Sequence, residues 1–205
     1  QRQMCIRDRA YSAASKDVFA IFRDTTPLVE GLSIDEAFLE VGGLRRIVGT
    51  PEEVAVRLRE RVRTEVGLAI SVGVARTKFL AKVASAVSKP DGLLVVEPER
   101  EEEFLLPLPV ERLWGVGAVT AEKLQRYGIR TVGQLAELEA ATAERMLGTA
   151  VGAHLHALAR LRDPRPVDTT RRRASIGSQR ALGTGPRSAE ELDLILTQIV
   201  DRLAR

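Results

Sequence analysis

The chain has 205 residues, of which 44% are hydrophobic and 29% are charged, as in ordinary globular proteins. No apolar run is long enough to span a bilayer, so we expect a protein that does not enter a membrane. The net charge is only +3, and the single cysteine, Cys5, cannot form an internal disulfide, which favours a reducing, cytoplasmic setting.

The two ends of the chain look truncated. It does not begin with Met, and it stops at Arg205 inside a helical pattern. Residues 1–9 show no periodicity that connects them with the rest of the chain, so we leave them unassigned, with a foreign origin as one explanation. Apolar residues at helical spacing over 12–22 then predict a helix.

The stretch 32–41 contains two adjacent acids, Asp35 and Glu36, inside an otherwise apolar, strand-like run. On a regular strand these side chains would point to opposite faces, whereas a turn lets them converge. The pattern therefore predicts a hairpin with both acids at or near its bend. Two carboxylates there suit Mg²⁺, and a pair of ordinary surface acids is the alternative.

The next segments predict an α/β layer with helices against a mixed sheet. Thr50, Pro51 and Glu53 form a helix start, and Gly67 ends that helix. Residues 68–74 predict a strand of the same sheet as the hairpin, in which Gly73 indicates a close approach to the backbone. A helix over 77–87, capped by Thr77, and a strand over 93–96 complete the layer.

Four cations lie on or beside the helix 77–87: Arg76, Lys78, Lys82 and Lys89. They are either solvated cations of a helix surface, the usual situation for Lys and Arg, or they face the acidic hairpin and bind a triphosphate. The sequence alone leaves both interpretations open.

After Pro109 the pattern changes to short helices separated by glycines. Gly115, Val116 and Gly117 form a turn that predicts a helix-hairpin-helix, in which backbone N–H groups approach a phosphate directly and Lys123 adds a charge. A tight helical hairpin selected for packing alone is the alternative. Trp114, the only tryptophan, is expected in the core.

Basic charge is concentrated late in the chain, with eight arginines and two aspartates between residues 160 and 187. Prolines and arginines there mark a linker. Residues 174–182 predict a strand, and Ser188 with Glu191 forms a capping box for a final helix.

In this order and spacing, the motifs at 33–39, 71–74, 77–85, 89–92 and 113–117 resemble the Y-family translesion DNA polymerases of the bacterial polymerase IV type. The resemblance implies an α+β architecture: a partial palm with a mixed α/β sheet (10–98), an all-α helix-hairpin-helix thumb (99–165), a basic linker (166–173) and the start of an α/β little finger (174–205).

The resemblance also implies the site. Asp35 and Glu36 would ligate two catalytic Mg²⁺ ions, with Ser33 lining the same place. The residues implied to contact the incoming nucleotide are Lys89, Ser33 and Arg76. Those implied to contact primer-template DNA are Gly115, Val116, Gly117, Lys123, Arg171, Arg172 and Arg173.

The implied reaction is attack of a primer 3′-hydroxyl on the α-phosphate of a deoxynucleotide (dNTP). The implied protein is a monomer, with a sliding clamp as a further partner of the full-length form. Relatives carry another metal-binding Asp on a first palm strand and a fingers domain, neither of which is present, and usually an Asp where this chain has Ala86. We therefore predict that the chain alone does not polymerise.

The residues also allow two other functions. The first is a non-catalytic DNA-binding or repair accessory module that uses the helix-hairpin-helix. The second is a helix-hairpin-helix nuclease, which the block 71–92 does not support.

Overall fold

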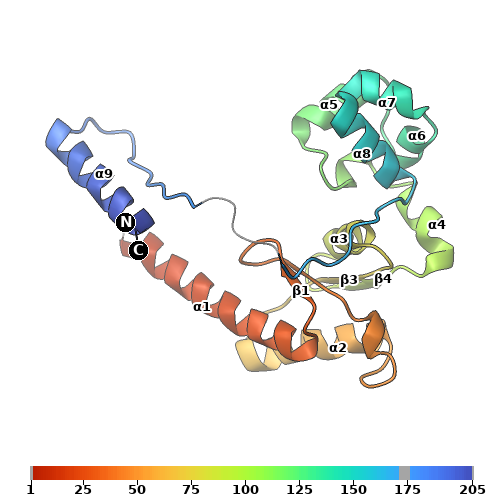
Figure 1. Ribbon diagram of the computed structural model, residues 1–205, viewed down its shortest axis with the longest axis horizontal. Helices are drawn as coiled ribbons and strands as arrows, with labels where there is room; N and C mark the ends of the chain where they lie inside the picture. The colour runs from red at the N-terminus through yellow and green to blue at the C-terminus, as the bar shows by residue number, and fades with distance from the viewer. Residues whose placement is uncertain (1, 171–175, 205) are drawn as a thin grey trace. The chain divides into compact units, whose positions relative to one another are not determined.

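The computed structural model describes residues 2–170 and 176–204, in two compact units that divide between Thr169 and Thr170 (Figure 1). The first unit contains, in chain order, α1 (Arg2–Thr25), β1 (Val29–Gly31), β2 (Ala37–Leu39), α2 (Pro51–Arg61), β3 (Val72–Val74), α3 (Lys78–Val87), β4 (Leu93–Val95), α4 (Glu101–Leu105), α5 (Ala118–Arg126), α6 (Val132–Ala136), α7 (Ala140–Leu147) and α8 (Thr149–Ala159). The second unit contains α9 (Ala189–Ala204). Within the described ranges, no helix is both long and apolar enough to cross a membrane.

The predicted acidic hairpin is confirmed. Strands β1 and β2 pair antiparallel, with Glu30 opposite Phe38, and the loop 32–36 joins them. The amide of Leu32 donates to the carbonyl of Glu36 at 2.8 Å, which closes the loop. Because Glu30 and Phe38 are directly opposed, their side chains lie on the same face, and both are buried.

The strands form two separate pairs, so the prediction that a strand over 68–74 shares a sheet with the hairpin is wrong. In the described part of the chain, β3 pairs only with β4, in parallel. Helix α3 lies on β3, and Lys78 and Lys82 of α3 form ion pairs with acids of the hairpin. These side-chain contacts, and not strand pairing, connect the hairpin to α3.

Helix α3 lies directly on β3, as Gly73 indicated. A Cβ atom at position 73 would lie 2.1 Å from the carbonyl oxygen of Ala81 and 2.3 Å from the amide nitrogen of Ser85. Only glycine permits this separation of helix and strand.

The boundaries of α2 and α3 follow the sequence signals, whereas α1 begins at Arg2, well before the predicted start at residue 12. Thr50 and Glu53 make both hydrogen bonds of a capping box at the start of α2. A five-residue π-helical turn (Val62–Val66) extends α2, and Gly67, with φ of 75°, ends it. Thr77 caps α3 by accepting from the amide of Leu80 at 3.3 Å.

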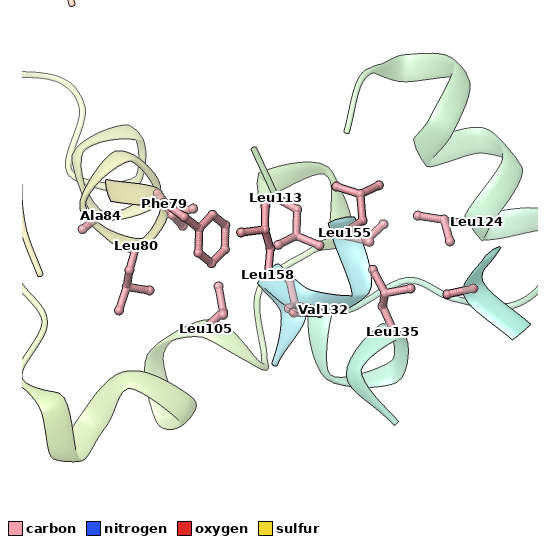
Figure 2. Close-up of a cluster of buried hydrophobic side chains, with 14 of the residues drawn as sticks. Phe79, Leu80, Ala84, Leu105, Leu113, Leu124, Val132, Leu135, Leu155 and Leu158 are labelled. Atoms are coloured by element: carbon pink, nitrogen blue, oxygen red, sulfur yellow. The ribbon is translucent and has the colours of Figure 1, made fainter. Parts of the chain in front are cut away.

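Two hydrophobic clusters hold the first unit together. The smaller one joins α1, α2 and the hairpin around Phe22, Leu58 and Val62. In the larger one, Phe79 and Leu80 of α3 belong to the same buried cluster as leucines and valines from the later part of the unit. Figure 2 shows these side chains. Helix α3 therefore shares a core with the helical region 101–159, so it is positioned by both parts.

The second unit confirms its predicted helix and contradicts its predicted strand. Ser188 and Glu191 exchange the two hydrogen bonds of a capping box before α9. Residues 176–182 form no strand, because no partner strand lies beside them within the described residues. Residues 174 and 175, and the predicted DNA contacts Arg171, Arg172 and Arg173, lie outside the described residues.

Candidate functional site

The hairpin loop presents three of the predicted site residues to solvent: Ser33, Asp35 and Glu36. The Ser33 hydroxyl donates to the Asp35 carboxylate and accepts from the Asp35 amide, so the two side chains lie together. Ser15 of α1 donates to the carbonyl of Ile34 and ties the loop to the helix. The loop thus has a defined conformation while its acids remain accessible.

Lys82, in the middle of α3, faces this loop. Its Nζ lies 2.8 Å from Glu36 Oε2, and the two side chains are 24% and 45% exposed. Lys82 therefore faces the acidic hairpin, as one of the two interpretations requires, while triphosphate binding stays a prediction.

Lys78, one turn earlier, makes a more deeply buried ion pair with Glu30, at 10% and 7% exposure. Its ammonium also donates to the carbonyl of Pro166 at 3.0 Å, and the Glu30 carboxylate also accepts from the amide of Asp168 at 2.7 Å. Glu30 therefore joins β1 to the segment that follows α8. Sequence reasoning did not single out Glu30, although an acid inside an apolar strand-like stretch was a usable signal.

Lys89 lies exposed in the turn between α3 and β4, and arginines of α2 and of the π-helical turn after it hold this turn. Arg59 donates to the carbonyl of Asp91 at 2.6 Å and to its carboxylate at 3.0 Å, and Arg63 also pairs with that carboxylate. The hydrogen bond from Arg59 lowers the pKa of Asp91. Because Asp91 has a positive φ of 44°, these contacts stabilise a backbone conformation that few residues adopt.

Arg76 pairs with an acid outside the hairpin. It makes a bidentate pair with Glu101, at 2.8 and 2.5 Å, and the side chain of Glu101 is only 4% exposed. A buried carboxylate needs such a partner, which explains why Arg76 is used here. The Arg76 side chain remains 62% exposed in this pair, so the prediction that it contacts a nucleotide stays a prediction.

Trp114 joins the hairpin to the helical region. Its ring lies 5.8 Å from that of Phe38 on β2, centroid to centroid. The Nζ of Lys82 lies 5.5 Å from the Trp114 ring and the guanidinium carbon of Arg165 lies 4.7 Å from it, both within cation–π range. Trp114 is partly buried against the larger cluster, in agreement with the expected packing role.

Asp163 holds the start of α3 to the segment after α8. It accepts from the amide of Phe79 at 3.0 Å, in the first turn of α3, and from two nitrogens of Arg165 at 2.6 and 3.0 Å. Burial alone would raise the pKa of Asp163, but the hydrogen bonds from Arg165 and Phe79 outweigh it and lower the pKa. In the sequence, Asp163 is only one of the two aspartates in the arginine-rich stretch 160–187.

The glycine turn lies at the start of α5. The element before it is a single 3₁₀ turn (Val110–Arg112), shorter than the predicted first helix. Gly115 has φ of +104°, and a Cβ added at Gly117 would meet nothing within 4 Å. No side chain caps α5 at Gly117, so its first amides face an open surface, with Lys123 exposed on the same helix.

The donors in the hairpin loop fit Mg²⁺ in kind and are few in number. Carboxylate and hydroxyl oxygens are the ligands that Mg²⁺ prefers, and this ion commonly takes one or two carboxylates with water and phosphate. In the residues that the structure describes, no three His, Cys, Asp or Glu side chains gather into a metal site. Asp35 and Glu36 are therefore an open, partial ligand set.

Two models of known protein families match this chain. The model of the impB/mucB/samB family matches residues 6–86, and the model of the IMS family HHH motif matches residues 98–129. The chain belongs to the impB/mucB/samB family, the Y family of DNA polymerases. The helix-hairpin-helix predicted from the glycine turn is confirmed as a motif of this family.

Relatives within the Y family are similar over nearly the whole chain. The chain is 47% identical over 194 residues to DNA polymerase IV 2 of Mesorhizobium japonicum, which covers 95% of this chain and 47% of that protein. It is 43% identical over 194 residues to DNA polymerase IV of Ralstonia nicotianae, covering 95% and 54%. The chain thus spans about half the length of the curated relatives it matches.

Solved structures of Y-family polymerases are similar to this chain in fold. DinB from Sulfolobus solfataricus gives a TM-score of 0.72 at 28% identity, over 78% of this chain and 48% of that one. The insertion ternary complex of Dbh DNA polymerase gives 0.72 at 29% identity, over 78% and 47%. The predicted α+β fold class, with small sheets followed by a helical region, is confirmed by this similarity to Y-family polymerases.

Proposed function

We propose that this chain is the palm and thumb part of an error-prone translesion DNA polymerase, which transfers a deoxynucleotide to a primer 3′-hydroxyl under the direction of a template. The observation that carries the proposal is the exposed Asp35 and Glu36 pair, held in one loop and faced by Lys82 of α3. The division into a palm, a thumb, a basic linker and the start of a little finger is part of the proposal.

The carboxylates of Asp35 and Glu36 would hold Mg²⁺, together with ligands from outside this chain. The metal supplies Lewis-acid stabilisation of the attacking and leaving oxygens. Ser33 positions Asp35 through the hydrogen bond between them. Lys89, exposed in a turn that Arg59 and Arg63 hold, would pair with the triphosphate as a point charge.

The turn at Gly115, Val116 and Gly117 would hold the primer-template backbone through amides of α5, and Lys123 would add a cation. Such contacts fix the position of DNA without reading its bases. A sliding clamp as a partner, a monomeric state and a cytoplasmic location complete the proposal.

The proposal is tested in a chimera, because the chain alone is predicted not to extend a primer. The 194 matched residues replace their counterparts in DNA polymerase IV of Ralstonia nicotianae, which supplies the rest. Primer extension with Mg²⁺ and four nucleotides is measured for the chimera and for its Asp35→Asn, Glu36→Gln double variant.

We expect extension by the chimera and a loss of at least about a hundredfold in the double variant, since metal stabilisation of the transition state is worth several kcal/mol. DNA affinity, from fluorescence anisotropy, should be nearly unchanged. Glu40→Gln, an exposed acid just after β2, is the matched control and should extend normally. Undiminished extension by the double variant would leave the non-catalytic accessory function as the better account.

A further inference from the structure

Helix α3 holds two acids of the hairpin through lysines one turn apart, but the two lysines are held differently. Lys78 has a buried acid, the carbonyl of Pro166 and the ring of Phe38 around its ammonium, the last at 5.2 Å. The ammonium of Lys82 lies near both the exposed carboxylate of Glu36, at 2.8 Å, and the ring centroid of Trp114, at 5.5 Å. The Lys82 ammonium thus has two favourable partners: an exposed carboxylate, and an aromatic ring that attracts a cation even when no carboxylate is paired with it.

We propose that Lys82 is an exchangeable internal counter-ion. It neutralises Glu36 while no divalent cation is bound, and a hard divalent cation at Asp35 and Glu36 displaces its ammonium, which remains on the face of Trp114. This inference rests on the proposed role of Asp35 and Glu36 in metal binding.

The physical reason is competition for one carboxylate. An ion pair of two partly exposed side chains is weak, because water and salt screen it, so it can be replaced. A divalent ion on the same loop would also repel the ammonium. The long lysine stem allows the ammonium to move while its methylene groups stay packed, and the aromatic ring gives it a favourable place.

The exchange would reach the thumb through Trp114. This residue directly precedes Gly115, the first glycine of the turn proposed to hold DNA. Arg165 also lies over the same ring, but its bidentate pair with buried Asp163 keeps it in place. Lys82 is therefore the cation at this ring whose position depends on the acidic loop.

Trp114 is the only tryptophan in the sequence, so its emission reports on this place without labelling. The first arm of the test contains no metal. Glu36→Gln releases Lys82 from its ion pair, and we expect a change in Trp114 emission relative to the unmodified chain. The same substitution combined with Lys82→Met should give no further change beyond Lys82→Met alone.

The second arm is a Mg²⁺ titration of the chain, followed by Trp114 emission and by calorimetry. The unmodified chain should change its emission in the same direction as Glu36→Gln does. Lys82→Met should bind Mg²⁺ about two- to fivefold more tightly, which is the range that an exposed ion pair provides, and its emission should not respond. Lys16→Met, an exposed lysine of α1, is the matched control and should behave as the unmodified chain.

Equal or weaker Mg²⁺ binding by Lys82→Met would overturn the inference, as would an emission response that survives in this variant. Lys82→Arg retains the charge and should keep the original affinity, and circular dichroism establishes that each variant is folded. If Mg²⁺ binds neither protein while Glu36→Gln still changes the emission, the metal role of the loop fails and the contact between Lys82 and Trp114 is upheld.

Discussion

Carboxylates at two places along α3 have opposite environments. Asp163, with a side chain 1% exposed, accepts hydrogen bonds from the first turn of α3 and from Arg165. Asp35 and Glu36, in the loop that faces the middle of α3, are exposed, and Glu36 has one partly exposed lysine beside it. The difference shows which acids are bound into the structure and which are accessible to a ligand.

Glycines show the same division. Gly73 and Gly152 allow backbones to touch, since a Cβ would lie 2.1 Å from Ala81 and 2.4 Å from Ala143, respectively. Gly117, in the turn before α5, has open space around it. We therefore compare a buried set around α3, comprising Gly73 and Asp163, with an exposed set, comprising the loop 32–36 and the turn 115–117.

The largest expected effect is on the buried set. Gly73→Ala places a methyl group against backbone atoms of α3, which cannot move without separating helix and strand. We expect a loss of about 3 kcal/mol in the free energy of unfolding, the upper range for overpacking. Urea unfolding followed by circular dichroism measures it. The matched change Gly117→Ala should stay within about 0.5 kcal/mol, and equal losses in the two variants would remove the distinction.

Asp163→Asn tests the buried carboxylate. We expect a loss of about 2 kcal/mol at pH 7, because Arg165 loses its charged partner and α3 loses a charge at its N-terminus. The pKa of Asp163 is lower in the folded chain than the ordinary value near 3.9 of an unfolded one. The stabilisation is therefore complete above about pH 5 and is lost as the pH falls through 3.9 toward the folded pKa.

This sign gives a control for the same variant. The difference in unfolding free energy between the unmodified chain and Asp163→Asn should be constant from about pH 7 to 5 and should shrink by about pH 3. A difference that grows on acidification would contradict the assignment.

A substitution in the exposed turn 115–117 should weaken DNA binding and leave the stability of the fold unchanged. Gly117 has φ of −87° and ψ of 176°, a conformation that any residue adopts, so Gly117→Val should fold normally. Its side chain would cover the first amides of α5 and weaken DNA binding about tenfold, the equivalent of one hydrogen bond to a charged group. Anisotropy with several duplex sequences should show the same loss for each, whereas a sequence-selective loss would exclude backbone contact.

The smallest effect on stability is expected for the acids of the loop. Asp35→Asn with Glu36→Gln should change the free energy of unfolding by less than about 0.5 kcal/mol, because exposed ion pairs contribute little. Glu30→Gln is the matched control: it leaves the buried Lys78 without a charged partner and should cost about 1–3 kcal/mol. Thermal unfolding of the variants compares them directly.

Local signals made much of the first unit predictable. Helix caps at Thr50 and Thr77, the end of a helix at Gly67, the hairpin around Asp35 and Glu36 and the contact at Gly73 all depend on residues close in sequence or on one backbone requirement. The strand predicted over 174–182 is wrong in its described part, because β propensity yields a strand only where a neighbouring strand accepts its hydrogen bonds.

Sequence by itself determined the chemistry that this chain can offer: two carboxylates in a hairpin loop, cations on one helix and a glycine turn, in an order similar to that of the Y family. Only the tertiary structure decided which acid each cation pairs with: Arg76 pairs with Glu101, Lys78 with Glu30 and Lys82 with Glu36. The reason is that ion pairs join residues 25 to 48 positions apart, and burial, which the sequence does not state, sets which acids require a partner.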